Sequence, residues 1–576
     1  MNLIKKIISN ENNFSLYTLF FILFLYSTTI AFLLQVIILP NYFPHWVNDL
    51  GLLNQTDSIL YHNLATELSS KINYFGWTHW ELVSDRHFIV GLTALFYTLI
   101  YPEPWVMIPL NSFVHALSGV ILARIALFFT KNRCVAFLAI MPYIFYPSAL
   151  MWISQLLKDG YFNLGAILFC YGWMIFATEN ISTKKLKYLI TPLIFILLGY
   201  ILMALVRPYT LYVMRMESNI FIVLILLFSM YMFFQKSINF HKFFKKIIFC
   251  IACFFALKVT MVTLTEHNIA KYDQIEYSDL ELNVTEEELD QLITSLEIRI
   301  AELKTVCCDM IICKKDQLGV NQCLAESDVA QSIDNSKLLE LQDSISLYKS
   351  QLIAHQKYRH HFKKYITAAE KQKTEDFEHN NNHEEMSTLK NFRGFKNSIY
   401  TDGFFWKPTN WIPEAFDTKL SALAGVRKQQ IERHLKDGRG RSMIDTDITF
   451  NNAIDILMYT PRASQIAFLS PFPDIWFGEG STKSTSVMRK ISMFEMIYIY
   501  IALVFLPLAL WRWKIKPELW VAFIYSYTML LFLTMSFPNI GTLYRYRYAF
   551  LMITITIALT YFFNFIEKYY KNNIKE

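Results

Sequence analysis

The chain has 576 residues, of which 54% are hydrophobic, 16% aromatic and 18% charged. This composition excludes a soluble globular protein, and the 48 phenylalanines and 33 tyrosines exclude disorder over most of the length. The net charge of +6 does not indicate nucleic-acid binding, because basic residues in a membrane protein usually report the orientation of the chain. The composition therefore indicates an integral membrane protein with no nucleic-acid partner.

Ten apolar stretches meet or approach the roughly 20 residues that a helix needs to cross a bilayer. They are residues 15–39, 105–130, 134–151, 160–177, 188–206, 219–234, 247–264, 493–511, 519–537 and 549–566. A further apolar run, 88–101, is shorter and ends at Pro102, so it predicts an interfacial helix. The first stretch has no small-residue cleavage site and is expected to be an uncleaved span.

Basic residues between the spans set the expected orientation. With ten spans and the N-terminus inside, every cytoplasmic segment is basic, and these segments hold Lys5, Lys6, Lys131, Arg133, Lys184, Lys185, Lys187, Lys236, Lys242, Lys245, Lys246, Arg512, Lys514, Lys516, Lys568, Lys571 and Lys575. The positive-inside rule then places both termini in the cytoplasm. The expected location is a bacterial inner membrane, with the remaining polar regions on its periplasmic face.

Three parts follow from this topology. The N-terminal membrane domain, 1–264, has seven spans and a first outer loop at 40–104, and the C-terminal membrane domain, 491–576, has three spans. Between them lies a periplasmic insert, 265–490. Within the insert, leucines at three-and-four spacing predict a coiled-coil-like helical hairpin at 286–357. A polar linker follows at 370–400, and a membrane-proximal aromatic segment follows at 404–477.

Four of the eight cysteines lie in the expected tip of this hairpin: Cys307, Cys308, Cys313 and Cys323. An even cluster on the oxidising side of the membrane favours two disulfides, with three possible pairings. A zinc site is the alternative, but the spacing has no CxxC pair and no nearby histidine. Asp445 and Asp447 predict a turn or a helix cap, with a shared cation as the alternative.

The first outer loop places an acidic residue at an expected helix start. Thr56, Asp57 and Ser58 precede an amphipathic helix, so Asp57 or Ser58 is expected to cap it by accepting backbone N–H bonds. A carboxylate fixed in this way beside the membrane is also suited to act as a general base on an acceptor hydroxyl, or to hold a divalent cation. The two roles are compatible, because a cap immobilises the side chain.

The pattern D-S-x-x-Y-x-x-L-A-x-E-L, which starts at Asp57 and includes Tyr61, resembles the first outer loop of GT-C lipid-linked-sugar glycosyltransferases, particularly relatives of the dolichyl-phosphate-mannose protein mannosyltransferases. The segment YPSALMWISQLLKDGYF, with Lys158 and Asp159, is similar to the second outer loop of bacterial members. PNIGTLYRYRYAFLM is similar to the last outer loop of polysaccharide-assembly membrane proteins. The order of these segments resembles the family over residues 15–235 and 440–566. Ser58 stands where many members carry a second acidic residue, so the cofactor is left undetermined, with a divalent cation as a candidate.

A polyprenyl phosphate-sugar is an anion at the membrane surface, so its site needs cations. Arginine's planar donor fork suits a phosphate, although each arginine alone is explained by snorkelling or by pairing with an acid. The resemblance implies that Asp57 deprotonates the acceptor, and it implies two further sets: Arg207, Arg545, Arg547 and Lys158 on the donor phosphate, and Asp159, Tyr61 and Arg215 along the cavity.

These features predict an all-α polytopic membrane protein with about ten transmembrane helices and a GT-C-like fold. The expected function is an inverting glycosyltransferase that moves a sugar from a polyprenyl-phosphate-linked donor to a glycan, lipid or protein acceptor on the periplasmic face. An O-antigen-type polymerase or ligase, which joins whole glycans from a polyprenyl diphosphate, is the first alternative. A non-enzymatic membrane assembly or scaffold protein, whose hairpin holds a partner, is the second.

Overall fold

A computed structural model describes residues 15–54, 56–84, 87–178, 187–235, 240, 243–260, 314–315, 321–322, 406–409, 411–436, 442–478 and 483–573. Its contacts divide the chain into two compact units. The larger unit combines Met1–His267 with Asn397–Glu576, and the smaller unit is Asn268–Lys396. Each unit is described by itself.

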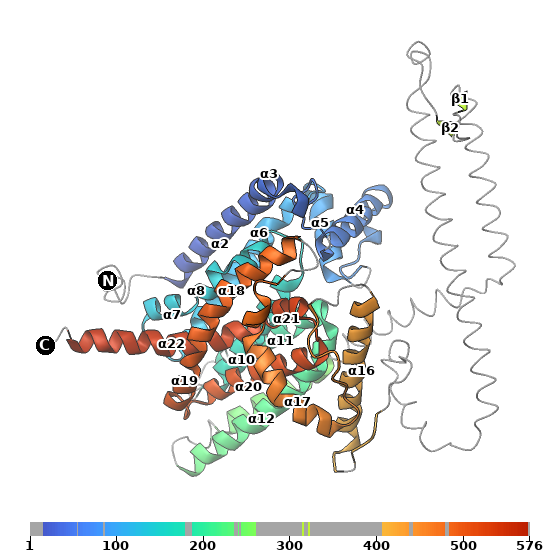
Figure 1. Cartoon of the computed structure of the whole chain (residues 1–576). Coiled ribbons are helices and arrows are strands. Elements are labelled where there is room, and N and C mark those ends of the chain that lie inside the picture. The colour runs from blue at the N-terminus through green and yellow to red at the C-terminus, as the bar shows by residue number, and fades with distance from the viewer. Residues whose placement is uncertain are drawn as a thin grey trace, which may run out of the picture. The chain divides into compact units, whose positions relative to one another are not determined.

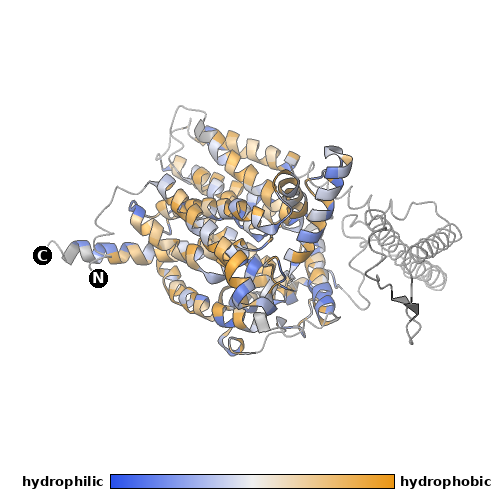
Figure 2. Ribbon diagram, turned by 90° about the horizontal axis from the view of Figure 1, so that it is seen from above, coloured by the Kyte–Doolittle hydropathy of each residue, from blue (hydrophilic) through white to orange (hydrophobic). Residues whose placement is uncertain are grey.

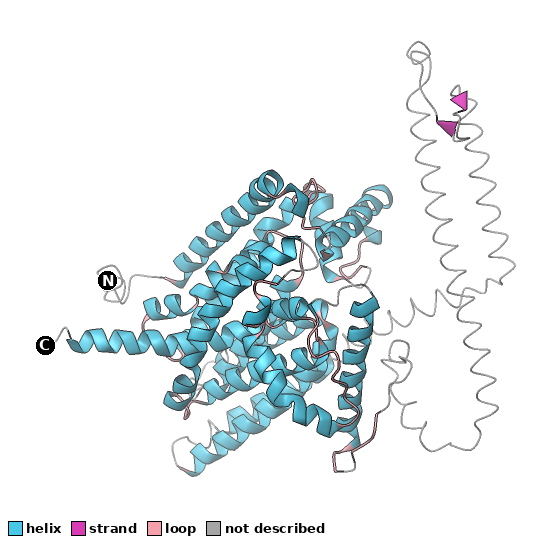
Figure 3. Cartoon of the chain, in the orientation of Figure 1, coloured by secondary structure: helices cyan, strands magenta, loops and turns pink. Residues whose placement is uncertain are grey.

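The described part of the larger unit is a bundle of helices joined by short loops (Figures 1 and 3). The elements are α2 (Leu16–Phe32), η1 (Leu33–Ile38), α3 (Leu39–Tyr42), η2 (Pro44–Trp46), α4 (Asp57–Phe75), η3 (Trp77–His79), α5 (Phe88–Leu99), η4 (Pro104–Met107), α6 (Ile108–Leu127), α7 (Arg133–Ala139), α8 (Met141–Phe145), α9 (Pro147–Ile153), α10 (Asp159–Ala177), α11 (Lys187–Val206), η5 (Pro208–Thr210), α12 (Leu211–Phe234), an unlabelled helix at 243–260, α16 (Glu414–Lys436), α17 (Ala453–Leu469), η7 (Pro473–Ile475), α18 (Lys483–Val504), α19 (Leu506–Arg512), α20 (Pro517–Ser536), α21 (Ile540–Tyr546) and α22 (Tyr548–Asn573).

Among the described residues, seven helices are long and apolar enough to cross a membrane: Leu16–Tyr42, Pro104–Leu127, Asp159–Ala177, Pro208–Phe234, Ser486–Arg512, Pro517–Ser536 and Tyr548–Tyr569. Figure 2 shows that apolar residues dominate the bundle. The chain is therefore an α-helical, multi-pass membrane protein. Seven of the ten predicted spans fall on these helices, and the other three, 134–151, 188–206 and 247–264, do not.

The predicted span 134–151 is divided by prolines into α7, α8 and α9. Just before α7, Asn132 donates from Nδ2 to Oε1 of Glu567, 3.0 Å away, near the end of α22. Just after α9, Asp159 pairs with Arg545, which precedes the start of α22. The segment between Asn132 and Asp159 therefore runs the length of α22, and it crosses the bundle as three short helices.

Helices α10 and α11 pack backbone against backbone. A Cβ atom added at Gly199 of α11 would lie 2.5 Å from the backbone nitrogen of Phe169 in α10, so only glycine fits. Small residues of this kind let helices approach closely in a bilayer. The close packing holds the first residue of α10, Asp159, beside Arg207, which follows the end of α11.

In the smaller unit, the described residues are a two-stranded antiparallel pair, β1 (Lys314–Lys315) and β2 (Asn321–Gln322). The predicted linker, 370–400, and the four cysteines predicted to form disulfides, Cys307, Cys308, Cys313 and Cys323, lie outside the described residues, as does the rest of the hairpin at 286–357. None of the cysteines of the described bundle forms a disulfide; they are Cys134, Cys170, Cys250 and Cys253.

The predicted insert, 265–490, does not form one unit. Its middle belongs to the smaller unit, whereas the residues from Asn397 onward belong to the larger one. Helices α16 and α17 lie within the predicted aromatic segment at 404–477, and both pack on α20 of the bundle. This aromatic segment is therefore part of the membrane domain's own fold.

Candidate functional site

The loop that precedes α4 is fixed by a side chain from another part of the chain. Gln155, which is buried, accepts a hydrogen bond from the backbone N–H of Leu53 at 2.8 Å and donates to the carbonyl of Gly51 at 3.1 Å. Gly51 has a φ of +70°, and a Cβ there would lie 1.9 Å from the carbonyl oxygen of Gln35. Gln155 therefore holds the start of α4 close to the start of α10.

Asp57 is the first residue of α4, but it does not cap the helix. The N-cap is Thr56, and no side chain accepts a capping hydrogen bond there. The hydroxyl of Thr56 instead donates to the carbonyl of Leu53 at 2.7 Å. The predicted capping role of Asp57 or Ser58 is therefore wrong, and the carboxylate of Asp57, 53% exposed, is available for another partner.

That partner is Arg545, from α21. Its Nη2 lies 3.6 Å from Oδ2 of Asp57, and its Nη1 lies 3.6 Å from Oδ2 of Asp159. Asn539 begins α21 by accepting a hydrogen bond from the N–H of Thr542, so the helix that carries Arg545 has a fixed start. One guanidinium, 24% exposed, thus joins carboxylates from α4 and α10.

A second, buried arginine, Arg207, contacts Asp159. Arg207, only 2% exposed, donates from Nη2 to Oδ1 of Asp159. Its guanidinium carbon lies 3.4 Å from the ring centroid of Tyr546 and 4.4 Å from that of Phe162. Such burial between aromatic faces suits arginine. Arg207 is therefore buried in the protein interior, where it positions Asp159.

Lys158 completes the cluster at the start of α10. Its Nζ lies 3.5 Å from Nδ1 of His87 and 5.8 Å from the ring centroid of Tyr61, on α4. Burial lowers the pKa of Lys158, and the charge of Arg207 lowers it further, whereas Asp159 acts in the opposite direction. Burial, followed by the charge of Asp57, raises the pKa of Tyr61, so this phenol stays neutral.

We name the group of Asp57, Lys158, Asp159, Arg207 and Arg545 the charge cluster. It holds three cations and two carboxylates, which leaves one positive charge in excess. Tyr61 lies beside it. Six of the eight predicted site residues, which come from four separate segments of the sequence, therefore meet at one end of the bundle.

Arg547 does not join the charge cluster. It is fully buried, and its guanidinium donates to the carbonyls of Ile466, Ala467 and Ser470, at 2.9 Å and 2.6 Å for the first two. These carbonyls end α17, so Arg547 satisfies a helix C-terminus. Its predicted phosphate-binding role conflicts with this geometry, and we replace it with a structural one.

Two other predicted positions also lie elsewhere. Arg215 is exposed on α12, near Tyr200. Asp445 has a φ of +50° and accepts hydrogen bonds from Arg462, at 3.0 Å, and from Tyr459, at 2.9 Å. These bonds lower its pKa, although burial acts in the opposite direction. Asp445 thus forms the predicted turn. Over the described ranges, no three His, Cys, Asp or Glu side chains gather as metal ligands.

Two residues near these contacts, Glu495 and His87, were not predicted from the sequence. Glu495, in α18, accepts hydrogen bonds from the N–H and the hydroxyl of Ser148, both at 2.8 Å, and another from Tyr544. It therefore caps the N-terminus of α9, in the middle of the broken crossing. A lone glutamate in an apolar run was a usable signal for it. No comparable signal marks His87.

Family models, curated proteins and solved structures were each compared with this chain, and none matches it.

Proposed function

We propose that the chain is a GT-C-like glycosyltransferase that uses a polyprenyl-phosphate-linked sugar as donor. The observation that carries this proposal is the contact of Arg545 with both Asp57 and Asp159. It puts a half-exposed carboxylate next to a cation at the surface of the charge cluster. A general base beside an anion-binding group is suited to glycosyl transfer from a phosphate-bearing donor.

The charge balance supports the same donor class. Three cations face two carboxylates in the cluster, so one further negative charge would make it neutral. A sugar joined to a polyprenyl phosphate is a phosphodiester and carries one negative charge. Its lipid tail would keep it at the membrane surface, and its phosphate would compete with the carboxylates for Arg545.

In the proposed reaction, Asp57 accepts the proton of an acceptor hydroxyl as its oxygen attacks the anomeric carbon of the donor. The bond between that carbon and the phosphate oxygen breaks, and the electron pair leaves with the polyprenyl phosphate. Arg545 and Lys158 neutralise the charge that develops on this leaving group. Arg207 keeps Asp159, and through it Arg545, in place. Attack opposite the leaving group inverts the anomeric centre.

Replacement of Asp57 by Asn tests the proposal. Sugar transfer from a panel of polyprenyl-phosphate sugars is measured in reconstituted vesicles, together with the melting temperature of the protein. We expect transfer to fall by at least about 100-fold with little change in melting temperature, because the general base alone is lost. Glu67→Gln is the matched control on α4, since Glu67 pairs with the exposed Lys71. Full activity of Asp57→Asn would contradict the assignment.

The same vesicles separate the proposal from the polymerase or ligase alternative. Supplied with lipid-diphosphate-linked repeat units, a polymerase accumulates long glycans, whereas the proposed enzyme adds single sugars from the monophosphate donor.

A further inference from the structure

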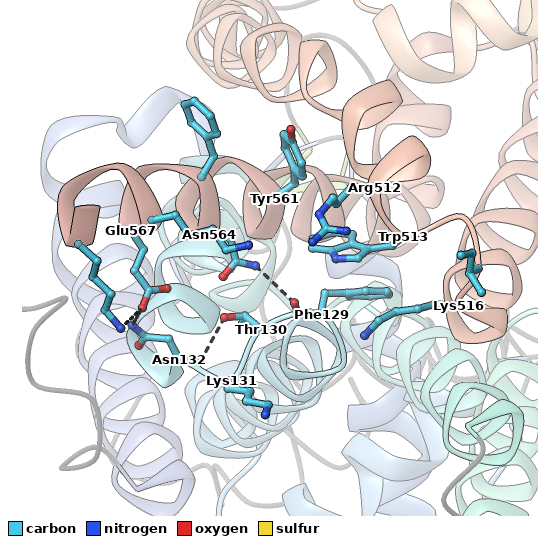
Figure 4. A pocket seen from close by; sticks show the side chains of 14 residues that line it. Phe129, Thr130, Lys131, Asn132, Arg512, Trp513, Lys516, Tyr561, Asn564 and Glu567 are labelled. Carbon is cyan, nitrogen blue, oxygen red and sulfur yellow. Dashed lines mark hydrogen bonds and ion pairs between the residues drawn. The ribbon is translucent and has the colours of Figure 1, made fainter. Parts of the chain in front are cut away.

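A second polar site lies at the opposite end of α22 from the charge cluster. It is a cavity of about 860 Å³ between the end of α6, the loop that joins α19 to α20, and the last turns of α22 (Figure 4). None of the residues that the sequence suggested for catalysis lines it. Three segments that are distant in the sequence form the cavity. Lys516, for example, donates a hydrogen bond to the carbonyl of Phe128, which lies 388 residues earlier in the chain.

The lining of this cavity is strongly basic. It includes five cations and one carboxylate: Lys131, Arg512, Lys516, Lys568, Lys571 and Glu567. Figure 4 shows Lys131 on one side of the recess, Arg512 and Lys516 on the segment that joins α19 to α20, and Glu567 on α22. The lining therefore carries four positive charges in excess, which is more than the charge cluster has.

Part of this charge is used inside the protein. Glu567 accepts from Asn132 at 3.0 Å and from Lys571 at 2.9 Å, and Lys516 donates to the carbonyl of Phe128 at 2.6 Å. These contacts tie the three segments together.

The remaining cations are Lys131, Arg512 and Lys568. None of the three forms a salt bridge with another residue in the described parts of the chain, and all three are exposed. Arg512 ends α19 and Lys131 follows α6, so they reach the cavity from opposite sides. Three cations that converge from three segments are suited to an anion with several acceptor oxygens.

Apolar side chains also line the cavity. The rings of Phe129 and Trp513 lie 4.6 Å apart, and Trp513 lies 6.0 Å from Tyr561. Phe565 and Ile515, also in the lining, have strongly exposed side chains. A ligand that fits both surfaces is amphiphilic, with an anionic head and an apolar tail.

The position of the cavity along the spans agrees with such a ligand. The candidate spans end at Leu127, Arg512 and Tyr569 and begin again at Pro517, and the lining residues follow or precede these points. The cavity therefore lies where hydrocarbon gives way to headgroups. Basic pockets between helices at this level bind lipid phosphates.

We propose that this cavity binds the phosphate headgroup of an anionic phospholipid, with Lys131, Arg512 and Lys568 on the phosphate and the rings of Phe129 and Trp513 beside the acyl chains. This site is separate from the proposed transferase site. Its occupancy would fix the α6, α19 and α22 ends of the bundle against one another.

The test measures the binding of phosphatidylglycerol to the full-length protein by native mass spectrometry, and the melting temperature in phosphatidylglycerol against phosphatidylcholine. We expect phosphatidylglycerol to bind and to raise the melting temperature relative to phosphatidylcholine. Replacing Arg512 by Gln is expected to weaken its binding about fivefold. Lys514→Gln is the matched control, because Lys514 belongs to the same loop and lies 4.2 Å from the Trp511 ring, but does not line the cavity.

Equal effects of Arg512→Gln and Lys514→Gln would overturn the proposal, since general attraction to a basic surface would then explain the binding. Equal stabilisation by phosphatidylcholine would overturn it as well. Inorganic phosphate is the third arm. If it stabilises the protein as much as the lipid does, the cavity binds a free anion and the assignment to a lipid is wrong. Sugar transfer is not measured, so failure here leaves the proposed function untouched.

Discussion

Lys158 is the cation in the charge cluster whose charge depends most on pH. Burial and the neighbouring Arg207 lower its pKa, so it loses its proton at a lower pH than the 10.5 of an ordinary lysine. The proposed phosphodiester donor stays anionic across this range. Its attraction to Lys158 is therefore complete at low pH and is lost as the pH rises through the lowered pKa.

We expect the dissociation constant of the donor to rise in the alkaline range, below pH 10.5. In Lys158→Arg the guanidinium keeps its charge, so this alkaline loss should disappear. Donor binding by both proteins is measured between neutral and strongly alkaline pH. An unchanged alkaline loss in Lys158→Arg would contradict the role assigned to Lys158.

Residue by residue, the sequence predicted this site well where charge and membrane level decide it. Asp57, Lys158, Asp159, Arg207 and Arg545 were all expected on the outer side of the membrane, and the structure brings them together. The sequence could not predict which of these residues are buried. Arg207 is buried against Asp159 rather than exposed at the surface, because the α10 and α11 backbones pack closely.

Arg547 shows a different limit. Two residues along a helix turn a side chain by about 200°, so Arg545 and Arg547 face opposite sides. A list of cations at one level cannot distinguish these faces, although helical geometry applied to Arg545 and Arg547 would have separated them.

At the scale of elements, Arg547 joins α17 to the start of α22. Its donors satisfy the carbonyls of Ile466, Ala467 and Ser470 at a buried helix end. In Arg547→Met the carbonyls of Ala467 and Ser470 lose this donor, which costs about 1–3 kcal/mol of folding free energy for each buried group left unsatisfied. The carbonyl of Ile466 keeps the hydrogen bond from the N–H of Ser470.

We therefore expect Arg547→Met to lower the melting temperature in detergent and the yield of folded protein. Arg545→Gln, two positions away, should keep the melting temperature and lose sugar transfer. The pair is measured side by side. The reverse pattern, with a stable Arg547→Met and an unstable Arg545→Gln, would contradict the roles assigned to both.

Helices were predicted best from the sequence where a long apolar run alone determines that a helix forms. The seven long apolar helices follow the expected spans, because about 20 consecutive apolar residues leave few alternatives. Polarity gave no such guidance for α16 and α17. They were assigned to an outer insert, yet they pack on α20, and only tertiary contacts reveal this.

For the whole molecule, the division into two units makes a clear prediction. The unit Asn268–Lys396 has its own internal contacts, so the bundle should fold without residues 286–357. We expect a chain in which a short glycine-serine linker replaces these residues to keep the melting temperature of the bundle and basal sugar transfer in vesicles. Complete loss of function with an intact bundle would favour the scaffold alternative.

Helix α22 also separates the two sites in space. It has 26 residues, which at 1.5 Å each is about 39 Å, more than the thickness of the hydrocarbon core of a bilayer, roughly 30 Å. The charge cluster lies at its beginning and the basic cavity near its end, so the two would open toward different leaflets. A single lipid cannot serve both, and a lipid that moved from one to the other would have to flip across the membrane. The phospholipid proposed for the cavity would therefore reside in one leaflet, whereas the proposed sugar donor would be consumed from the other.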